Sequence, residues 1–434
     1  MVGTLANAFK VKELRDKILY VFFAFFLFVL MVHISVPGVN LTAWHKLLQE
    51  GAVFAFLGMI TGGALNNFSI GAMGITPYIN ASIIMQLLTV VIPKLHEIQK
   101  EGGDAGRRKI SQYIRLLTMG LAILQATVMV IGLGRYKPEG ESIFLIQGPL
   151  YYLTVIFSLV AGTAFLMWLG EQMTDKGVGN GVSLIIFGGI VLRYPTYLFQ
   201  TFQLAGLKGP RYFVNLGLFF ILAIILVMGI IMLTQGQRKV PVQYAKRVVG
   251  RRVFGGQSTY IPIRVNNAGV ISIIFAISIL YLPTTFAQFM RPEQGTFLYG
   301  VVQFINTLFR PDGWFYNLAY ALLVIAFTYF YAYITFNVID IADNLKKNGG
   351  FIPGIRPGRP TAEYLSRILS RVTFIAAIAL AVIAVAPTYV MAMTKVTTFY
   401  LGSTSLLIVV GVALDTMQQI EARMLMRHYQ GIMK

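Results

Sequence analysis

The chain has 434 residues, of which 56% are apolar, 12% are charged and none is cysteine. About a quarter of the residues in a water-soluble domain are charged, so this composition excludes an ordinary soluble enzyme. The missing cysteine excludes disulfides, thiolate metal sites and cysteine nucleophiles. The formal net charge of +19 points to an anionic partner, such as nucleic acid or a membrane surface. We therefore expect a polytopic membrane protein.

Long apolar stretches recur along the whole chain. A helix needs about 20 mainly apolar residues to cross the hydrocarbon core of a bilayer. Ten such stretches lie at 18–36, 74–93, 113–133, 150–169, 182–200, 213–235, 269–289, 314–339, 372–393 and 401–420. The first follows a basic segment, as a signal peptide would, but it has no small-residue cleavage site, so we interpret it as a retained helix. The prediction is an all-α protein with ten membrane spans.

The positive charge is distributed unequally between the two sides of the predicted spans. If both termini and the alternate loops share one side, that side has 27 of the 36 basic residues. Loops rich in Lys and Arg stay in the cytoplasm. We therefore predict that both termini are cytoplasmic.

Two of the cytoplasmic loops hold 13 of these 27 basic residues. Residues 237–267 include seven basic residues and no acidic one, and residues 340–371 include six basic residues among seven closely spaced glycines and prolines. The glycines and prolines predict turns, and Arg356 lies between two prolines at a predicted bend. Basic loops can serve orientation alone. The second interpretation is a surface that binds a polyanion, such as ribosomal RNA or an acidic protein.

The region before the second span does not fit a simple helix. Residues 51–93 are mildly apolar throughout, too long for one span and too short for two with a loop. Its first part, 54–70, is interrupted by Gly58, Gly62, Gly63, Asn66 and Asn67. Irregular backbone at membrane depth is tolerated only where it is buried in protein or lines a cavity. We predict a re-entrant half-helix; an external loop with a short surface helix is the alternative.

The number of spans indicates how the chain is organised. Ten spans divide into five and five, which gives an N-terminal half, 1–205, and a C-terminal half, 206–434. Because five is odd, the second half begins on the opposite side from the first. This is the arrangement of an inverted repeat, in which the functional site lies between the halves near the midplane.

The predicted spans contain few of the titratable side chains that catalysis requires. Glu171, Asp340 and Asp343 lie near helix ends, and Asp415 is alone in the last span. No metal-ligand, nucleophile or phosphate-loop motif occurs. We expect neither an enzyme nor a cofactor or metal. Asn180, at the start of the fifth span, is typical of a helix cap. On these residues alone, a secondary transporter for a small solute remains an alternative.

Six motifs resemble the SecY family of bacterial protein-conducting channels. They are FSIGAMGITPYINASIIMQLL at 68–88, GRRKISQY at 106–113, WLGEQ at 168–172, YAKR at 244–247, PGIRPG at 353–358 and GSTSLLI at 402–408. They occur in the same order as in that family and cover nearly the whole chain. The resemblance implies an hourglass-shaped channel that translocates unfolded secretory polypeptides and releases hydrophobic segments sideways into the membrane.

The resemblance also implies roles for individual residues. The aliphatic ring at the waist would consist of Ile75, Ile79, Val182, Ile186, Ile274 and Ile408. The segment 54–70 would be the plug that closes the pore from outside, with Phe54, Gly58, Gly62, Gly63, Asn66 and Asn67. Polar residues near the lateral gate, between the second and third and the seventh and eighth spans, would be Gln86 and Asn180. The docking set for the ribosome and the motor would be Arg107, Arg108, Lys246, Arg247, Arg251, Arg252, Arg356 and Arg359.

The partners and location follow from the same resemblance. They are the SecE and SecG subunits, the SecA motor ATPase, the ribosome, signal sequences and nascent polypeptides, and membrane lipids including anionic ones. The location is the bacterial cytoplasmic membrane. The chain departs from the family at Ser35, Ser272 and Val338, where proline is usual. Losing these prolines should straighten the helices that contain them.

Overall fold

The structure is a computed structural model, and it describes most of the chain. The described residues are 9–50, 58, 61–101, 103–135, 142–244, 247–249, 252–254, 258–266, 269, 271–290, 297–310, 313–396 and 403–432. The helices are α2 (Lys12–His33), α3 (Leu41–Glu50), α5 (Thr76–Val91), α6 (Pro93–Glu101), α7 (Gly103–Arg135), α8 (Pro149–Lys176), α9 (Gly181–Lys208), α10 (Pro210–Gln235), α11 (Ile271–Met290), α12 (Phe297–Leu308), α13 (Trp314–Thr335), α14 (Val338–Lys347), α15 (Arg359–Thr394) and α16 (Ser403–Ile432). The strands are β1 (Gln237–Tyr244), β2 (Arg247–Val249), β3 (Arg252–Phe254), β4 (Ser258–Arg264) and β5 (Gly350–Phe351).

Each of the ten predicted spans coincides with a helix. These helices are α2, α5, α7, α8, α9, α10, α11, α13, α15 and α16. Within the described residues, eight helices are long and apolar enough to cross a bilayer unaided. Helix α5 reaches that length only together with α6, at a bend of 106°. The helical fold class is confirmed, and among the described residues α5 is a predicted span that needs the helix after it to reach spanning length.

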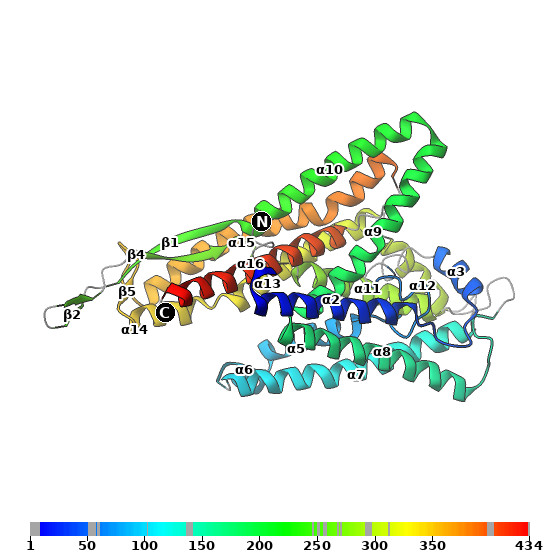
Figure 1. Cartoon of the computed structure of the whole chain (residues 1–434), viewed down its shortest axis with the longest axis horizontal. Coiled ribbons are helices and arrows are strands. Elements are labelled where there is room, and N and C mark those ends of the chain that lie inside the picture. Colours follow the sequence, from blue (N-terminus) through cyan, green and yellow to red (C-terminus); the bar gives the residue numbers. More distant parts are fainter. Residues whose placement is uncertain are drawn as a thin grey trace. The chain divides into compact units, whose positions relative to one another are not determined.

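The helices belong to two compact units, and each is described by itself. The first comprises Met1–Gly209, Ser278–Gly313 and Thr397–Lys434, and the second comprises Pro210–Ile277 and Trp314–Val396. In the first unit α7 packs against both α5 and α8, α8 packs against α9, and α16 packs against α9 (Figure 1). In the second unit α15 packs against α10, α13 and α14.

The core of the first unit is an apolar cluster that includes the loop after α2. Trp44 and Phe68 are buried, with their rings edge to face at a centroid distance of 4.9 Å, and Phe68 contacts Phe144 in the same way at 6.1 Å. By contrast, Leu116 and Leu124 on α7 point outward and are exposed. An apolar exterior is what a bilayer solvates, so these outward faces are consistent with lipid contact.

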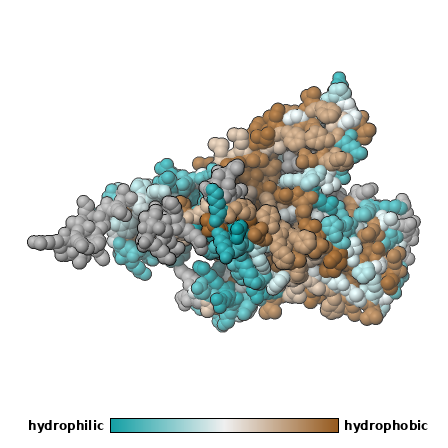
Figure 2. All heavy atoms as spheres, in the orientation of Figure 1, coloured by the Kyte–Doolittle hydropathy of each residue, from teal (hydrophilic) through white to brown (hydrophobic). Residues whose placement is uncertain are grey.

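The second unit contains a small sheet that the prediction of turns did not include. Strand β1 pairs antiparallel with β4 on one side and β5 on the other. Val240, Val242 and Ile263 alternate with exposed residues and point into a cluster under the sheet. Period-two burial of β-branched residues is typical of a strand. Figure 2 shows a hydrophilic surface over this sheet and a hydrophobic one over α10.

Candidate functional site

The segment before α5 is buried and irregular. Residues 61–75 form consecutive turns, and Gly58 is helical. The half-helix predicted over 54–70 is therefore absent at 61–70. Gly62 and Gly63 have φ angles of +65° and +90°, which glycine adopts without strain and which interrupt a right-handed helix. Phe54 lies outside the described residues.

The C-terminal part of this segment, 65–75, is fixed by hydrogen bonds. Val36 N–H donates to the Phe68 carbonyl and Ile70 N–H donates to the Ile34 carbonyl, both at 3.0 Å. The Trp44 indole Nε1–H donates to the buried Leu65 carbonyl at 2.7 Å. Trp44 is not among the functional residues predicted from the sequence. Its signal is a lone tryptophan in a short amphipathic helix beside the broken segment.

The N-terminal part, described at Gly58 and at 61–64, instead lies close to the backbone and side chains of its neighbours. A Cβ added at Gly58 would collide with the Asn66 side-chain oxygen, so the two residues are in close contact. A Cβ added at Gly63 would collide with the Arg193 guanidinium of α9. Asn67, just beyond, donates from Nδ2 to the Val32 carbonyl at 3.3 Å. All of these predicted plug residues therefore lie in one tightly packed region.

Five of the predicted ring residues belong to the first unit. Ile75 is the residue before α5 and is 2% exposed, and Ile79 is half-buried one turn later. Ile186 is 3% exposed on α9, and Val182 is half-buried one turn before it. The fifth is on α16 and is described next. Ile274, the sixth, is half-buried on α11 in the second unit.

Helix α16 places Ile408 on the side that faces α9. Ser405 is hydrogen-bonded to Tyr194 of α9, and Gln419 Oε1 accepts from the Gly179 N–H at 3.1 Å. Positions 405, 408, 412, 416 and 419 follow one another at spacings of three and four, so they share a helix face. Ile408, 2% exposed, therefore lies on the face of α16 that packs against the helix bearing Val182 and Ile186.

The two predicted gate residues have local partners. Asn180 is the N-cap of α9, and its Oδ1 accepts from the Ser183 N–H at 3.2 Å. This confirms the cap interpretation, since a cap oxygen satisfies one of the free N–H groups at a helix start. Gln86 is half-buried on α5, and its backbone carbonyl accepts a hydrogen bond from the Thr89 hydroxyl at 2.7 Å.

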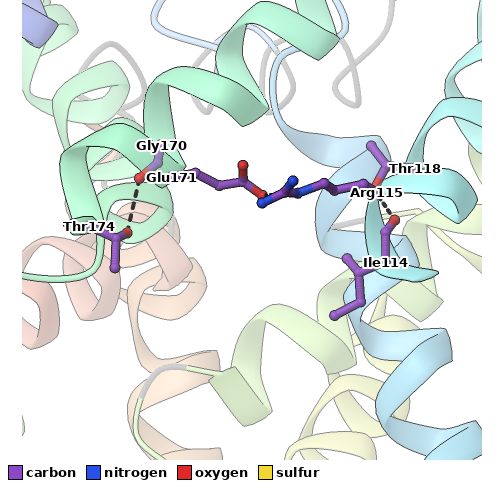
Figure 3. A network of polar contacts seen from close by, with 6 residues as sticks. All are labelled: Ile114, Arg115, Thr118, Gly170, Glu171 and Thr174. Carbon is purple, nitrogen blue, oxygen red and sulfur yellow. Dashed lines mark hydrogen bonds and ion pairs between the residues drawn. The ribbon is translucent and has the colours of Figure 1, made fainter. Parts of the chain in front are cut away.

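A charged pair joins α7 to α8. Arg115 Nε donates to Glu171 Oε1 at 2.7 Å, and the glutamate side chain is 21% exposed (Figure 3). Thr118 and Thr174 donate to the carbonyls one turn earlier on their own helices. Glu171 is thus one half of an ion pair. Among the described residues, no group of three or more His, Asp or Glu could hold a metal ion.

The described residues of the predicted docking set are exposed. Arg107 and Arg108 lie in the first turns of α7, and Arg356 lies in the turn between β5 and α15. Arg359 is also exposed and forms an ion pair with Glu363 at 3.3 Å. The remaining members are less fully described: Lys246 and Arg251 lie outside the described residues, and Arg247 and Arg252 are described only as backbone in the β2–β3 hairpin.

The sheet brings the two basic loops together. Strand β1 comes from 237–267 and β5 from 340–371, and they pair at Gln243 opposite Phe351 and at Tyr244 opposite Gly350. A side chain on Gly350 would collide with the Tyr244 ring. The loop that bears Arg356 is therefore held against the loop that bears the seven basic residues.

Known proteins resemble this chain over its full length. The SecY family profile matches residues 69–417. A protein translocase subunit SecY from Thermotoga maritima is 45% identical over 99% of this chain and 97% of its own length. The chain belongs to the SecY family. Another SecY relative, from Halalkalibacterium halodurans, is also 45% identical and matches over the full length of both chains.

Solved structures of SecY and related channels have the same fold. The structure of a protein conducting channel matches with a TM-score of 0.65 at 17% identity, covering 94% of this chain and 92% of that one. A structure described for the SecY plug domain, which stabilises the closed state of that translocation channel, matches with a TM-score of 0.66 at 18% identity and the same coverage. The helices and the re-entrant segment thus form a SecY-type channel fold.

Proposed function

We propose that this chain forms a channel through which unfolded secretory polypeptides cross the bacterial cytoplasmic membrane and from which hydrophobic segments pass sideways into lipid. The observation that carries this proposal is full-length identity of 45% to translocase subunits from two bacteria. The SecY-type fold and the buried, irregular segment before α5 support it.

The pore closes at an aliphatic ring. Its members are Ile75, Ile79, Val182, Ile186, Ile274 and Ile408. A constriction of aliphatic side chains dewets, so it resists ions, yet it has no fixed bonds to break when a polypeptide enters. The halves 1–205 and 206–434 are the inverted repeats on either side of this pore. The chain supplies no nucleotide-binding motif, so the driving energy comes from partners.

A plug and a lateral gate control the two exits. The segment 54–70 is the plug, and its position in the closed state blocks the pore from outside. The gate opens between the second and third and the seventh and eighth spans. Gln86 lies beside this gate, and Asn180 contributes there while capping its helix. An uncharged plug suits this role, because residues 51–92 include no charged side chain that would resist burial.

The basic loops dock the partners on the cytoplasmic side, where both termini also lie. The docking residues are Arg107, Arg108, Lys246, Arg247, Arg251, Arg252, Arg356 and Arg359. A structure of Sec61 in the canine ribosome-channel complex shares this fold, with a TM-score of 0.60. Exposed arginines bind RNA phosphates and acidic protein surfaces. The same face serves the ribosome and the SecA motor, while SecE, SecG and anionic lipids contact the channel within the membrane.

Photocrosslinking to a stalled secretory polypeptide tests the channel. The crosslinker is placed at Ile79, Ile186 or Ile408 in the full chain, reconstituted with its partner subunits in vesicles. We expect adducts from all three positions and none from Leu124, which is 48% exposed on the outer face of α7 and serves as the control. Absence of adducts at all three positions, in protein shown to be correctly inserted, would contradict a polypeptide path through this ring.

A further inference from the structure

Arg193 is a charged residue that belongs neither to the predicted aliphatic ring nor to the predicted docking set. It is the one charged residue in the predicted span 182–200. It lies about 18 Å along α9 from Gly181, well inside a hydrocarbon core of about 30 Å. An ionised side chain at this depth is costly, and it usually has a function and an identifiable partner.

The contact of Arg193 is with the plug. Its guanidinium occupies the space where a Cβ of Gly63 would lie. One turn earlier on α9, Gly189 contacts Gly62. A Cβ added to Gly62 would lie 3.0 Å from the Gly189 Cα. Because Gly189 and Arg193 are four residues apart, they share a helix face. The left-handed Gly62–Gly63 turn therefore lies flat on that face of α9.

The same face of α9 continues to the predicted ring. Ile186 is three residues before Gly189 and seven before Arg193, and Val182 is four residues before Ile186. These spacings place all four on one side of the helix. A plug that rests on Gly189 and Arg193 thus lies along the side of α9 that bears the two ring residues.

The chemistry of this contact is reversible. Residues 51–92 include no carboxylate, so nothing there forms an ion pair with the guanidinium. The planar group packs instead against glycine backbone, whose carbonyls it can also approach as a donor. Glycine is required on the plug side, because a Cβ would displace the guanidinium and Gly63 has a φ of +90°.

Among the described plug residues, Gly63 is the one against which Arg193 packs, and the residues after it have partners of their own. Leu65, two residues after Gly63, is fixed by the Trp44 indole, and Phe68 is fixed by Val36. We propose that Arg193 is a positioning residue that holds the Gly62–Gly63 turn on α9 in the idle channel, so that the plug opens when this contact parts while residues 65–75 stay in place. This inference rests on the proposed channel function.

Cysteine labelling tests the proposal directly, since the chain has no native cysteine. Ala64, fully buried beside Gly63, is replaced by cysteine in the reconstituted, idle channel, and its reaction with a membrane-impermeant maleimide is timed. We expect Arg193→Met, which keeps a flexible unbranched side chain but removes the charged plane, to raise the labelling rate at least fivefold. The idle ion leak should rise in parallel. Arg193→Lys should give an intermediate rate, because it keeps the charge and loses the plane.

Two further measurements distinguish holding the plug from a general loss of structure. With Trp168 and Trp314 replaced by phenylalanine, the remaining Trp44 fluorescence reports residues 65–75 and should not change in Arg193→Met. Gly206→Ala, at an open position on the same helix, should label at the parent rate. An unchanged labelling rate in Arg193→Met, in protein that still translocates polypeptide, would overturn this role and leave the channel intact. A parent protein that does not translocate would instead overturn the channel function. A rise in labelling accompanied by a change at Trp44 would also contradict the proposal, because residues 65–75 would then have moved.

Discussion

The two parts of the plug segment are held by different kinds of contact. Residues 65–75 have backbone bonds to the loop after α2, an indole bond at 2.7 Å and aromatic packing. Residues 61–64 include the two left-handed glycines, which lie against Gly189 and Arg193. The first kind resists displacement, because every buried polar group and ring would lose its partner. The contact with α9 is packing of glycine backbone against Gly189 and the Arg193 guanidinium, so this part is held less firmly, although the Asn67 and Ser69 N–H groups also donate to the Gly63 and Ala64 carbonyls at 3.2 and 2.9 Å. The difference shows how a short segment can be both attached and movable.

The largest expected effect comes from removing the fixed end. Trp44→Ala deletes a fully buried ring and leaves the Leu65 carbonyl without its donor. We expect a loss of about 3–5 kcal/mol in unfolding free energy, measured by denaturant unfolding of the purified protein in detergent. The matched control is Trp168→Ala, because Trp168 is 49% exposed. Equal losses for the two variants would contradict the assignment of Trp44 as the anchor.

The next effect concerns the movable end. Gly63→Ala requires a non-glycine residue at a φ of +90° and a Cβ in the space of the Arg193 guanidinium. The backbone alone should cost about 1–2 kcal/mol, and we expect a higher idle ion conductance in planar bilayers. Gly206→Ala is the control, since its Cβ meets no neighbour and alanine favours a helix. Parent-like conductance in Gly63→Ala would remove the distinction between the two parts.

A smaller effect is expected where α8 contacts the end of the segment. The buried Thr163 hydroxyl donates to the Gly74 carbonyl at 3.3 Å. Thr163→Val keeps the shape and should cost about 1 kcal/mol for one lost hydrogen bond, with no change in idle conductance. Unfolding and bilayer recordings on the same preparation measure both quantities. Increased conductance in this variant would mean that the fixed part also moves during opening.

The smallest effect concerns the scaffold behind the segment. Arg115→Met or Glu171→Gln breaks the pair between α7 and α8, of which the arginine is half exposed. Partly exposed pairs contribute about 0.2–1 kcal/mol, so we expect a slight loss of stability and no loss of translocation. A double-mutant cycle isolates the coupling between the two residues. Coupling well above this range would indicate that the pair is buried when the membrane is present.

The local sequence pattern was sufficient to predict the helices but not the irregular segments and strands between them. Each predicted span is a helix, because a run of about 20 apolar residues in a bilayer must satisfy its backbone N–H and C=O groups within the segment. A helix does this whatever its neighbours are. The segment 61–70 was predicted as part of a half-helix and forms turns instead, because two glycines adopt positive φ angles that only their surroundings select. The strands in the basic loops were also missed, since β5 is two residues long and exists through its pairing with β1.

By itself the sequence determined the membrane class, the ten helical segments, the unequal basic charge and the family, because composition, periodicity and ordered motifs are local properties. The tertiary structure alone decided the contacts between distant residues. Arg193 contacts Gly63, 130 residues earlier in the chain, and the Trp44 indole donates to the Leu65 carbonyl. Ile408 lies on the face of α16 that packs against α9. Such contacts depend on which helix faces meet, and a helix of apolar residues on every side does not encode that choice in its own pattern.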